Sequence, residues 1–410
     1  MKSLSEARVA IVLEWFQRFG GVERVLVEMR KALPGADLFA LVHDPKSLVR
    51  TPLEGVSVKT SFIQSLPRVK ERYRSYLPLM PVAIEQFDLR PYDLVLSSSH
   101  AIAKGVLTQA DLLHVSYTYT PVRYAWDLYL DYLTESGMDR GIKGLLTRAL
   151  LHYIRLWDTG AANRVDAYLT LSHYVERRIW RLYRRPARVI YPPVDVDRYR
   201  PDLLRDKFFV TVSRFVPYKR IDLIVDSFAR MGHELVVIGE GPDRAKIERL
   251  SGPNVRILGY QPDEVVADYL QRARAFIFAA DEDFGIAPIE AQAAGCPVIA
   301  YGKGGVMETV VGWPAPNATG LFFDTQTSEA LEAAVNLFEA HEAEFEPKTC
   351  RHNAERFSQE RFQRDFRATV EELWYRFQLG EDLDRCIGGS PGEPTKEVNV
   401  IPVSLRQHPM

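Results

Sequence analysis

Two positively charged residues follow a predicted strand in the second half of the chain. Arg214 and Lys219 lie five residues apart in SRFVPYK (213–219), directly after the predicted strand 208–212. Two cations at a strand end can hold a diphosphate, because hydrogen bonds between charged groups contribute about 1.5–3 kcal/mol each. The alternative is a solvated basic turn before the helix that starts near Arg220, since Arg and Lys are common at surfaces.

A second segment, DEDFGIAPIE (281–290), follows the predicted strand 275–279 and opens a helix. Pro288 suits the first helical position, where its missing N–H costs no hydrogen bond. Gly285 allows a ligand to approach the backbone closely. The unpaired amides at the start of the helix, together with the helix dipole, favour a phosphate at this point.

Two carboxylates flank this predicted phosphate site. Glu282 lies in the loop before the helix and Glu290 in the predicted first turn, so each can hold hydroxyl groups beside the phosphate. The alternative for Glu290 is an acid that only stabilises the helix dipole. Asp281 and Asp283 also form an Asp-x-Asp pattern that is typical of metal sites. We predict no metal, because the helix N-terminus already supplies positive potential.

Strands and helices alternate regularly in the second half. The predicted strands are short apolar runs at 208–212, 235–239, 255–259, 275–279, 297–300 and 321–323, and the predicted helices are at 221–231, 243–250, 263–272, 288–294 and 328–340. Apolar strands without alternation are typical of a parallel sheet covered on both faces. The second half therefore predicts a doubly wound α/β domain.

The first half follows the same pattern less regularly. Its predicted strands are at 8–13, 38–42, 94–97, 113–117, 168–171 and 189–191, with a helix at 22–33 after Gly20-Gly21. Pro192 and Pro193 can continue neither a helix nor a central strand, so the chain must leave the first domain there. We predict domains at 1–195 and 196–355, a helical segment at 356–386 that packs back toward the first domain, and a mobile tail at 387–410.

Composition limits the class of protein. The 410 residues are 46% hydrophobic and 26% charged, which excludes a mainly disordered or fibrous chain. Three widely spaced cysteines argue against a disulfide framework. We find no transmembrane run and no signal peptide, and therefore expect a cytoplasmic protein. No Gly-x-Gly-x-x-Gly, Walker A, His-Glu-x-x-His or Gly-x-Ser-x-Gly motif occurs.

Charge is distributed unevenly along the chain. Residues 1–200 hold 29 Lys and Arg against 21 Asp and Glu, whereas the remaining residues hold 23 against 33. A basic first half suits an anionic acceptor or membrane surface, and the alternative is chance surface charge. Nucleic-acid binding is disfavoured, because the predicted ligand site belongs to the acidic half.

Taken together, these segments resemble the family 4 retaining glycosyltransferases of the GT-B fold. The matching features stand in the family's order and are SRFVPYK (213–219), GEGP (239–242), GY (259–260) and the Glu-x7-Glu spacing of 282–290. In the first half, GGVERV (20–25) looks like the family's first Gly-rich loop. SSSHAIAKG (97–105) and YTPVRYAWD (119–127) are similar to a subgroup of bacterial mannosyltransferases that build O-antigen and exopolysaccharide.

The resemblance implies a fold and a division of labour. The fold would be α/β, with two Rossmann-like doubly wound parallel-sheet domains facing across a cleft. Domain 1–195 would bind the acceptor, and domain 196–355 would bind the nucleotide sugar at the carboxyl ends of its strands. The protein would lie in the cytoplasm or peripherally on the cytoplasmic face of the inner membrane.

The resemblance also implies roles for individual residues. Arg214 and Lys219 would bind the donor diphosphate and assist catalysis, together with Glu282, which would hold the sugar hydroxyls. Glu290 would bind the ribose. The other implied donor contacts are Gly21, Gly239, Tyr260, Phe284, Gly285 and Ile286, and the implied acceptor residues are Tyr119, Arg123 and Asp127.

The activity implied is retaining, metal-independent transfer of mannose from GDP-mannose to a glycan or lipid-linked acceptor in cell-surface polysaccharide synthesis, such as that of lipopolysaccharide. The nucleotide sugar would be a co-substrate, and no further cofactor is expected. A UDP-sugar donor is the first alternative. Two others remain open, namely a sugar-nucleotide-binding subunit without catalysis and a sugar-nucleotide epimerase.

One residue departs from the family pattern. The family usually has His where this chain has Tyr119, and a phenol is not a proton acceptor near neutral pH. His100 and His114 lie nearby in the sequence, but His114 falls inside an apolar strand. We therefore predict that His114 is a hydrogen-bonded core residue.

The segment 141–157 combines apolar and basic residues. Lys143, Arg148 and Arg155 stand among the apolar residues Leu145, Leu146, Leu150, Leu151, Ile154 and Trp157. With Arg68, Lys70, Arg72 and Arg74, this segment can rest on anionic lipid. The alternative is a helix that simply packs on its own domain.

Overall fold

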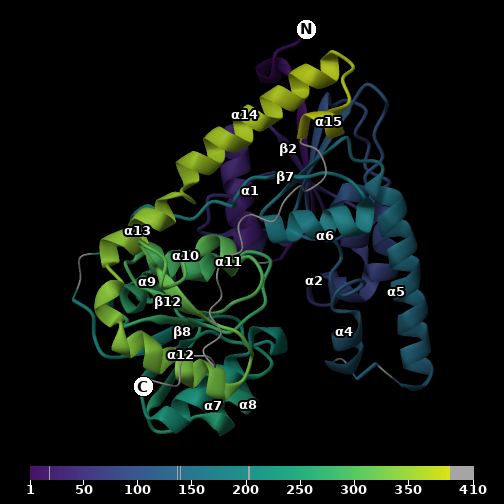
Figure 1. Cartoon of the computed structure of the whole chain (residues 1–410). Helices are drawn as coiled ribbons and strands as arrows, with labels where there is room; N and C mark the ends of the chain where they lie inside the picture. The colour runs from purple at the N-terminus through teal and green to yellow at the C-terminus, as the bar shows by residue number, and fades with distance from the viewer. Residues whose placement is uncertain (18, 136, 139, 202–203, 388–410) are drawn as a thin grey trace. The chain divides into compact units, whose positions relative to one another are not determined.

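The chain forms two compact units (Figure 1). The computed structural model describes residues 1–17, 19–135, 137–138, 140–201 and 204–387, so the predicted mobile tail lies outside them except for Ile387. The first unit contains Met1–Pro192 and the described residues of Phe362–Glu393, and the second contains Pro193–Arg361. Among the described residues, no helix has the length and apolar character needed to span a bilayer.

A seven-stranded parallel sheet forms the centre of the first unit, in the order β3-β2-β1-β4-β5-β6-β7. The strands are β1 (Val9–Phe16), β2 (Asp37–His43), β3 (Val58–Thr60), β4 (Leu94–Ser99), β5 (Leu113–Thr118), β6 (Ala167–Thr170) and β7 (Arg188–Val189). β4, β5 and β6 are buried along their whole length, as expected of strands covered on both faces.

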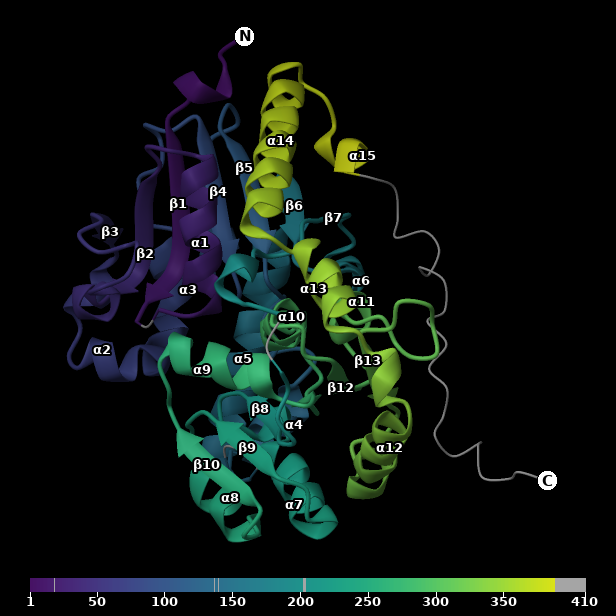
Figure 2. The same cartoon turned by 90° about the vertical axis from the view of Figure 1, so that its left-hand side faces the viewer.

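The helices of the first unit come from both ends of the chain. They are α1 (Gly21–Ala32), α2 (Val69–Arg72), α3 (Met80–Ile84), α4 (Tyr129–Glu135), α5 (Gly141–Ala162) and α6 (His173–Tyr183), with most of α14 (Gln359–Gln378) and α15 (Leu383–Ile387). Figure 2 shows α14 alongside α1, where Gln363 Nε2 lies 2.5 Å from Glu28 Oε2. The indole N–H of Trp374 also donates to the Lys2 carbonyl at 2.8 Å, so α14 is part of this unit's core.

A six-stranded parallel sheet forms the centre of the second unit, in the order β10-β9-β8-β11-β12-β13. The strands are β8 (Phe209–Val212), β9 (Leu235–Ile238), β10 (Val255–Gly259), β11 (Phe276–Phe278), β12 (Val298–Tyr301) and β13 (Gly320–Phe323). The helices are α7 (Ile221–Met231), α8 (Arg244–Leu250), α9 (Asp263–Arg272), α10 (Ile286–Ala293), α11 (Val306–Thr309), α12 (Ser328–Ala340) and α13 (Pro347–Glu355).

The strand order of the second unit marks where a ligand can bind. From β8 the chain proceeds to β9 on one side, whereas β11 leads to β12 on the other. Strand order therefore reverses between β8 and β11, and open parallel sheets bind ligands at such a point, beyond the carboxyl ends of the strands. The two segments singled out by their chemistry, 213–219 and 281–290, follow these two strands.

The pattern of the second half predicted its helices closely. α7, α9 and α12 have the predicted bounds, but α10 begins at Ile286, two residues before Pro288. The prediction that Pro288 is the first helical residue is therefore wrong. Proline is tolerated at this third position, because the first four N–H groups of a helix have no partner within it.

Candidate functional site

The loop after β8 is held by the loop after β9. The Phe215 amide donates to the Glu240 carbonyl at 2.9 Å. A Cβ atom at Gly239 would lie 1.7 Å from the Ser213 carbonyl oxygen, and one at Gly241 would lie 2.2 Å from that of Phe215. Only glycine fits between these backbones, so Gly239 fixes the loop that carries the candidate cations.

The two predicted cations end up in different environments. Phe215 is fully buried and fastens the middle of the loop, while the Arg214 side chain before it is exposed. Lys219 ends a short 3-10 helix, Pro217–Lys219, and its side chain is largely buried. The loop therefore presents one guanidinium to solvent and one ammonium group from a more enclosed position.

The loop after β11 is supported by Gly304 and Gly305, which follow β12. The Gly305 amide donates to the Glu282 carbonyl at 2.8 Å. A Cβ atom at Gly304 would lie 2.3 Å from that same carbonyl oxygen, and one at Gly305 would lie 2.4 Å from the Asp283 carbonyl oxygen. The glycine pair after β12 thus allows the Glu282 backbone to pack directly against it.

Helix α10 begins immediately beyond this loop. Gly285 adopts a left-handed φ of 88°, which reverses the chain and lets the helix start at Ile286. Phe284 is buried and packs edge-on against Phe357. The amides of the first turn lack partners within the helix, and with the helix dipole they favour an anion.

The rest of α10 is anchored by a buried polar network. Glu290 is the fifth residue of the helix, so the prediction that it lies in the first turn is wrong. Two residues on, the Gln292 amide donates to the Pro288 and Thr309 carbonyls at 3.1 and 3.0 Å. Asn353 donates to Gln292 Oε1 at 2.7 Å. These bonds fix α10 against α11 and α13.

An ion pair joins the two candidate segments. The Lys219 ammonium group contacts Glu282 Oε1, and both side chains are largely buried, with exposed fractions of 16% and 17%. The sequence predicted that these residues serve different parts of one ligand but did not predict that they contact each other. The contact places a cation and a carboxylate side by side at the reversal point of the sheet.

Tyr260 lies at the end of β10, next to the same group of loops. It follows Gly259, which has a left-handed φ of 72° and whose carbonyl accepts from the Gly239 amide at 2.9 Å. The Tyr260 side chain is 76% exposed. An aromatic ring this exposed offers a face for a planar ligand group to stack on.

In the first unit, the Gly-rich loop leads directly into α1. Gly21 is the first residue of α1, and the Gly20 amide donates to Glu23 Oε2 at 2.9 Å. Burial raises the pKa of the Glu23 carboxyl. Gly21 is exposed, so the backbone at the start of α1 is accessible.

The three predicted acceptor residues lie in the loop between β5 and α4. The Tyr119 hydroxyl is 3.0 Å from Ser98 Oγ, and burial raises the Tyr119 pKa. Asp127 is held by an ion pair with the buried Arg178, which also donates to Thr120 Oγ1 at 2.9 Å. Tyr119 is therefore a neutral phenol in a fixed position and not a base.

Two family models match consecutive parts of the chain. The model described as "Glycosyltransferase Family 4" matches residues 19–198, and the model described as "Glycosyl transferases group 1" matches residues 196–357. The chain belongs to the family 4 glycosyltransferases. The resemblance seen in the sequence is confirmed through most of both units of this glycosyltransferase.

Several curated relatives of the glycosyltransferase are mannosyltransferases. A GDP-mannose-dependent alpha-(1-6)-phosphatidylinositol monomannoside mannosyltransferase of Mycobacterium tuberculosis is 31% identical over 205 residues, which cover 42% of this chain and 51% of that protein. The alpha-1,3/1,6-mannosyltransferase ALG2 of Kluyveromyces lactis is 22% identical over 273 residues, covering 52% and 54%. The chain thus spans about half the length of these curated relatives.

Solved structures share the fold. Alr3699/HepE of Anabaena in complex with UDP has a TM-score of 0.64 at 16% identity, covering 89% of this chain and 100% of that one. WaaG, a glycosyltransferase involved in lipopolysaccharide biosynthesis, has a TM-score of 0.63 at 16% identity, covering 88% and 99%. The predicted GT-B fold class, with two parallel-sheet α/β domains, is confirmed.

Glu14, a buried carboxylate in β1 of the glycosyltransferase, was not among the predicted residues. Its Oε1 accepts from four consecutive backbone amides, 100–103, at 2.8–3.0 Å, and from Ser99 Oγ at 3.1 Å. Its Oε2 forms an ion pair with His100 Nδ1 at 3.0 Å. Burial alone would raise the Glu14 pKa, but the His100 charge and the hydrogen bonds lower it to about 2. A single acid in an otherwise apolar strand was the available signal.

A buried ion pair was also missed. Lys104 contacts Asp158 Oδ1, and both side chains are almost fully buried. Asp158 Oδ2 accepts from Trp126 Nε1 and from the Tyr183 hydroxyl, each at 2.8 Å. This network joins the loops after β4 and β5 to α5 and α6, so it fixes the loops that carry the predicted acceptor residues.

His114 is the core histidine that its apolar strand predicted. Nδ1 lies 3.0 Å from the Arg164 carbonyl and therefore carries the proton, and Nε2 accepts from Ser97 Oγ at 2.9 Å. Burial lowers the His114 pKa to about 4. Both ring nitrogens are occupied within the core, which leaves His114 no role in binding.

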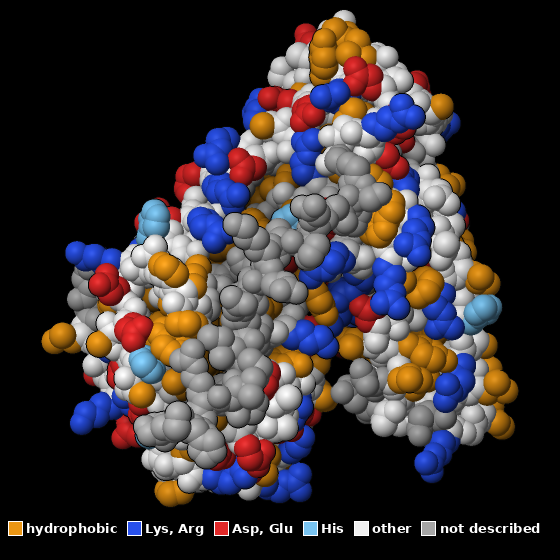
Figure 3. All heavy atoms as spheres, viewed as in Figure 1, with side chains coloured by type: hydrophobic (Ala, Val, Ile, Leu, Met, Phe, Trp, Pro, Cys, Tyr) orange, Lys and Arg blue, Asp and Glu red, His pale blue; other side chains and the backbone are white. Residues whose placement is uncertain are grey.

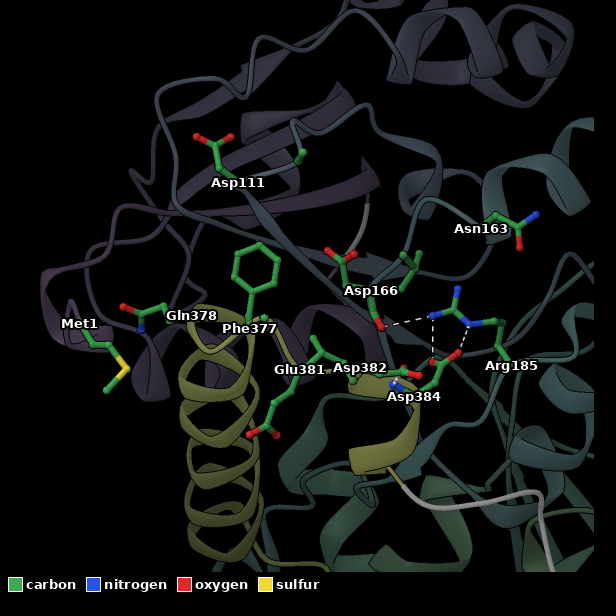
Figure 4. A pocket seen from close by; sticks show the side chains of 14 residues that line it. Met1, Asp111, Asn163, Asp166, Arg185, Phe377, Gln378, Glu381, Asp382 and Asp384 are labelled. Carbon is green, nitrogen blue, oxygen red and sulfur yellow. Dashed lines mark hydrogen bonds and ion pairs between the residues drawn. The ribbon is translucent and has the colours of Figure 1, made fainter.

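A pocket of about 830 Å³ in the first unit lies away from these loops (Figure 4). It includes Asp111 and Asp166, which precede β5 and β6 and therefore lie at the amino-terminal edge of the sheet. Arg185 donates to both carboxylate oxygens of Asp384 at 2.6 and 2.9 Å. The pocket is a docking region for α15, at the opposite edge of the sheet from the candidate residues.

Proposed function

We propose that the chain is a retaining, metal-independent glycosyltransferase that transfers mannose from GDP-mannose to a glycan or lipid-linked acceptor in cell-surface polysaccharide synthesis. The observation that carries the proposal is the Lys219–Glu282 contact at the reversal point of the second sheet. It joins the two segments to which we assign the diphosphate and the sugar, at the position where parallel sheets bind ligands.

In this proposal, the second unit binds the donor. Arg214, Lys219 and the first amides of α10 hold the diphosphate, because they supply positive potential without a metal ion. Glu282 holds the sugar hydroxyls, and Glu290 holds the ribose. The base stacks near Tyr260, whose exposed ring supports that assignment.

The remaining donor contacts follow from the backbone. The amides of Phe284, Gly285 and Ile286 contact the sugar and phosphate, and the left-handed Gly285 directs the chain into α10. Gly239 acts through the close packing that shapes the cation loop. Gly21 gives the start of α1 an accessible backbone that suits a phosphate.

The proposed chemistry depends on charge. As the sugar–phosphate bond breaks, negative charge grows on the diphosphate and positive charge grows on the sugar. Fixed cations and amides stabilise that charge more strongly in the transition state than in the ground state, and this difference accelerates the reaction. The departing phosphate takes the acceptor's proton as the acceptor attacks the same face, so no protein nucleophile takes part.

Mannose and GDP are chosen on the names of the relatives. The Mycobacterium tuberculosis relative is named as a GDP-mannose-dependent enzyme acting on a phosphatidylinositol monomannoside. A UDP-sugar is the alternative donor, because the Anabaena neighbour was solved with UDP. A lipid-linked acceptor would place the protein on the cytoplasmic face of the inner membrane.

Tyr119, Arg123 and Asp127 are the proposed acceptor residues. Asp127 is partly exposed and oriented by Arg178, which suits a carboxylate that accepts hydrogen bonds from sugar hydroxyls. The buried Tyr119 phenol favours the second candidate function, a subunit that binds a sugar nucleotide without turnover. Retention of Glu282 in contact with Lys219 favours the transferase.

The experiment is transfer of radiolabel to a lipid extract. The chain is incubated with the extract and with GDP-mannose or UDP-glucose, each labelled in the sugar, in the presence of a chelator. We expect label to enter the organic phase from GDP-mannose and to be lost with Glu282→Ala. If label enters the organic phase from UDP-glucose and not from GDP-mannose, the donor is a UDP-sugar and the assignment of GDP-mannose is wrong. Binding of donor without turnover would support the binding subunit.

A further inference from the structure

Helix α5 (Gly141–Ala162) carries two apolar faces. One face packs into the first unit, where Leu151, Ile154 and Ala161 are buried. The other face points to solvent, and its large apolar residues are Ile142, Leu145, Leu146, Tyr153 and Leu156, which are 78%, 68%, 65%, 40% and 63% exposed. The predicted alternative of a helix packed on its own domain therefore accounts for only one face.

The exposed residues form one continuous stripe. Their spacings of three, four and seven residues place them on the same side of a helix, opposite Leu151 and Ile154. At 1.5 Å per residue, the stripe from Ile142 to Leu156 is about 21 Å long. Monomeric soluble proteins rarely expose contiguous apolar surface of this kind without using it for binding.

The charges of α5 have a single sign at the surface. Lys143 and Arg148 are exposed beside the stripe, whereas Arg155 is half-buried and donates to the Ala125 carbonyl at 3.0 Å. Asp158 is the only acidic residue in the helix. Asp158 is fully buried and paired with Lys104. Figure 3 shows hydrophobic and basic side chains together along the right-hand edge, over α5. The outer face of α5 is therefore apolar along its centre, with basic residues beside it.

We propose that the outer face of α5 is a docking surface for an anionic phospholipid bilayer. The helix lies flat on the membrane, its apolar stripe enters the headgroup boundary, and its basic residues contact lipid phosphates. This proposal adds a membrane partner to the proposed function. It rests on that function, because the lipid-linked acceptor lies in such a bilayer.

Charge decides between a bilayer and a second copy of the chain. A two-fold contact through this stripe would bring the same patch of each copy together. Lys143 and Arg148 would then face the cations of the partner copy, with no surface carboxylate on α5 to compensate. An anionic bilayer complements both the apolar stripe and the basic flanks.

The test is sedimentation of the full chain with lipid vesicles. Phosphatidylcholine vesicles are compared with vesicles that also contain phosphatidylglycerol. We expect the wild-type chain to sediment with the anionic vesicles and Leu145→Gln/Leu156→Gln to lose about tenfold or more in affinity. Lys143→Gln/Arg148→Gln should lose most of the preference for anionic lipid. Equal binding by the apolar variant and the wild type would overturn the proposal.

The matched control is Tyr375→Gln/Leu379→Gln, in the last turn of α14 and just after its end, where two apolar residues are also exposed, at 52% and 49%. This variant should bind vesicles like the wild type, and an equal loss by it would overturn the assignment to α5. Folding of each variant is checked by its unfolding temperature. If Leu145→Gln/Leu156→Gln folds like the wild type but converts a lipid-free dimer to a monomer, the surface is a copy-to-copy interface and the proposal fails.

Stabilisation by GDP separates this proposal from the proposed function. If the chain binds anionic vesicles through α5 but no nucleotide stabilises it, the proposed transferase function is refuted and the proposed docking surface still holds. A chain that is stabilised by GDP but shows no vesicle binding would refute the docking surface alone.

Discussion

At the scale of single residues, the Lys219–Glu282 ion pair sets the competition that a ligand of the proposed donor site must meet. The Glu282 carboxylate partly neutralises the ammonium group that we assign to the diphosphate. An incoming diphosphate must therefore compete with Glu282 for Lys219. The same exchange releases the Glu282 carboxylate to accept hydrogen bonds from the sugar hydroxyls.

The first prediction concerns Glu282→Ala. Transfer should fall by about a hundredfold or more, because a group that holds the reacting sugar is lost. GDP affinity should stay equal or rise, since the Glu282 carboxylate no longer competes for Lys219. Radiolabel transfer and titration calorimetry with GDP measure the two quantities. Glu329→Ala on α12, whose side chain is 78% exposed, is the control and should leave both unchanged. Weaker GDP binding by Glu282→Ala would contradict the competition.

The second prediction follows from His114. Its pKa is about 4 in the folded chain and about 6.5 in an unfolded one, so the unfolded state takes up a proton first as pH falls. The free energy of unfolding should therefore fall by about 3 kcal/mol between pH 6.5 and pH 4 from this residue alone. His114→Gln should lack this component.

Tryptophan fluorescence can follow that unfolding, because five of the six tryptophans lie in the first unit. The comparison is the slope of stability against pH for the wild type and for His114→Gln. Identical slopes would show that His114 is not held neutral by its two hydrogen bonds.

At the scale of elements, buried polar groups position the loops of the first unit. The Glu14 carboxylate accepts hydrogen bonds from the backbone amides that follow β4. The Lys104–Asp158 pair then links that loop to α5 and, through Trp126, to the loop after β5. Hydrophobic packing alone would leave such loops free to shift, whereas directional bonds give them one conformation.

The third prediction tests this network. Asp158→Asn should destabilise the first unit by about 3–5 kcal/mol, because it leaves the buried Lys104 charge uncompensated. Lys104→Met/Asp158→Asn should be more stable than Asp158→Asn alone, since the buried charge is then removed. Denaturant unfolding followed by tryptophan fluorescence gives both values. If the loss of unfolding free energy in the double variant equals the sum of the losses in the two single variants, Lys104 and Asp158 are not coupled.

Local patterns predicted the elements of the second unit well. The amphipathic repeats of α7, α9 and α12 contain the information that sets their bounds. β3 was missed because it is a three-residue edge strand whose two polar residues, Lys59 and Thr60, are exposed. The start of α10 was misplaced because the helix begins at Ile286, directly after the left-handed Gly285, and not at Pro288.

Contacts between residues far apart in the chain could not be predicted from the sequence. The motifs predicted which loops carry the candidate site, since each follows a strand at the reversal point of the sheet. They did not predict that Lys219 contacts Glu282 across 63 positions, or that Glu14 binds amides 86–89 positions away. Such pairings depend on strand order and on how loops pack, which local residue patterns do not contain.

At the scale of the whole molecule, each unit has a separate proposed task. The second unit carries the proposed donor residues on the loops after β8 and β11. The first carries the proposed acceptor residues and, on α5, the proposed membrane surface. Donor binding and vesicle binding should therefore be separable by variants in different units, without one abolishing the other.

The most direct test of the central claim is thermal stabilisation by GDP, UDP, ADP and dTDP at equal concentration, with a chelator present. At a hundred times its dissociation constant, a ligand adds about 2.7 kcal/mol, which raises the unfolding temperature by about 5 °C or more for a unit of this size. We predict that GDP gives the largest shift and that Lys219→Ala loses most of it. No shift with any nucleotide, or an equal shift in Lys219→Ala, would contradict the donor site.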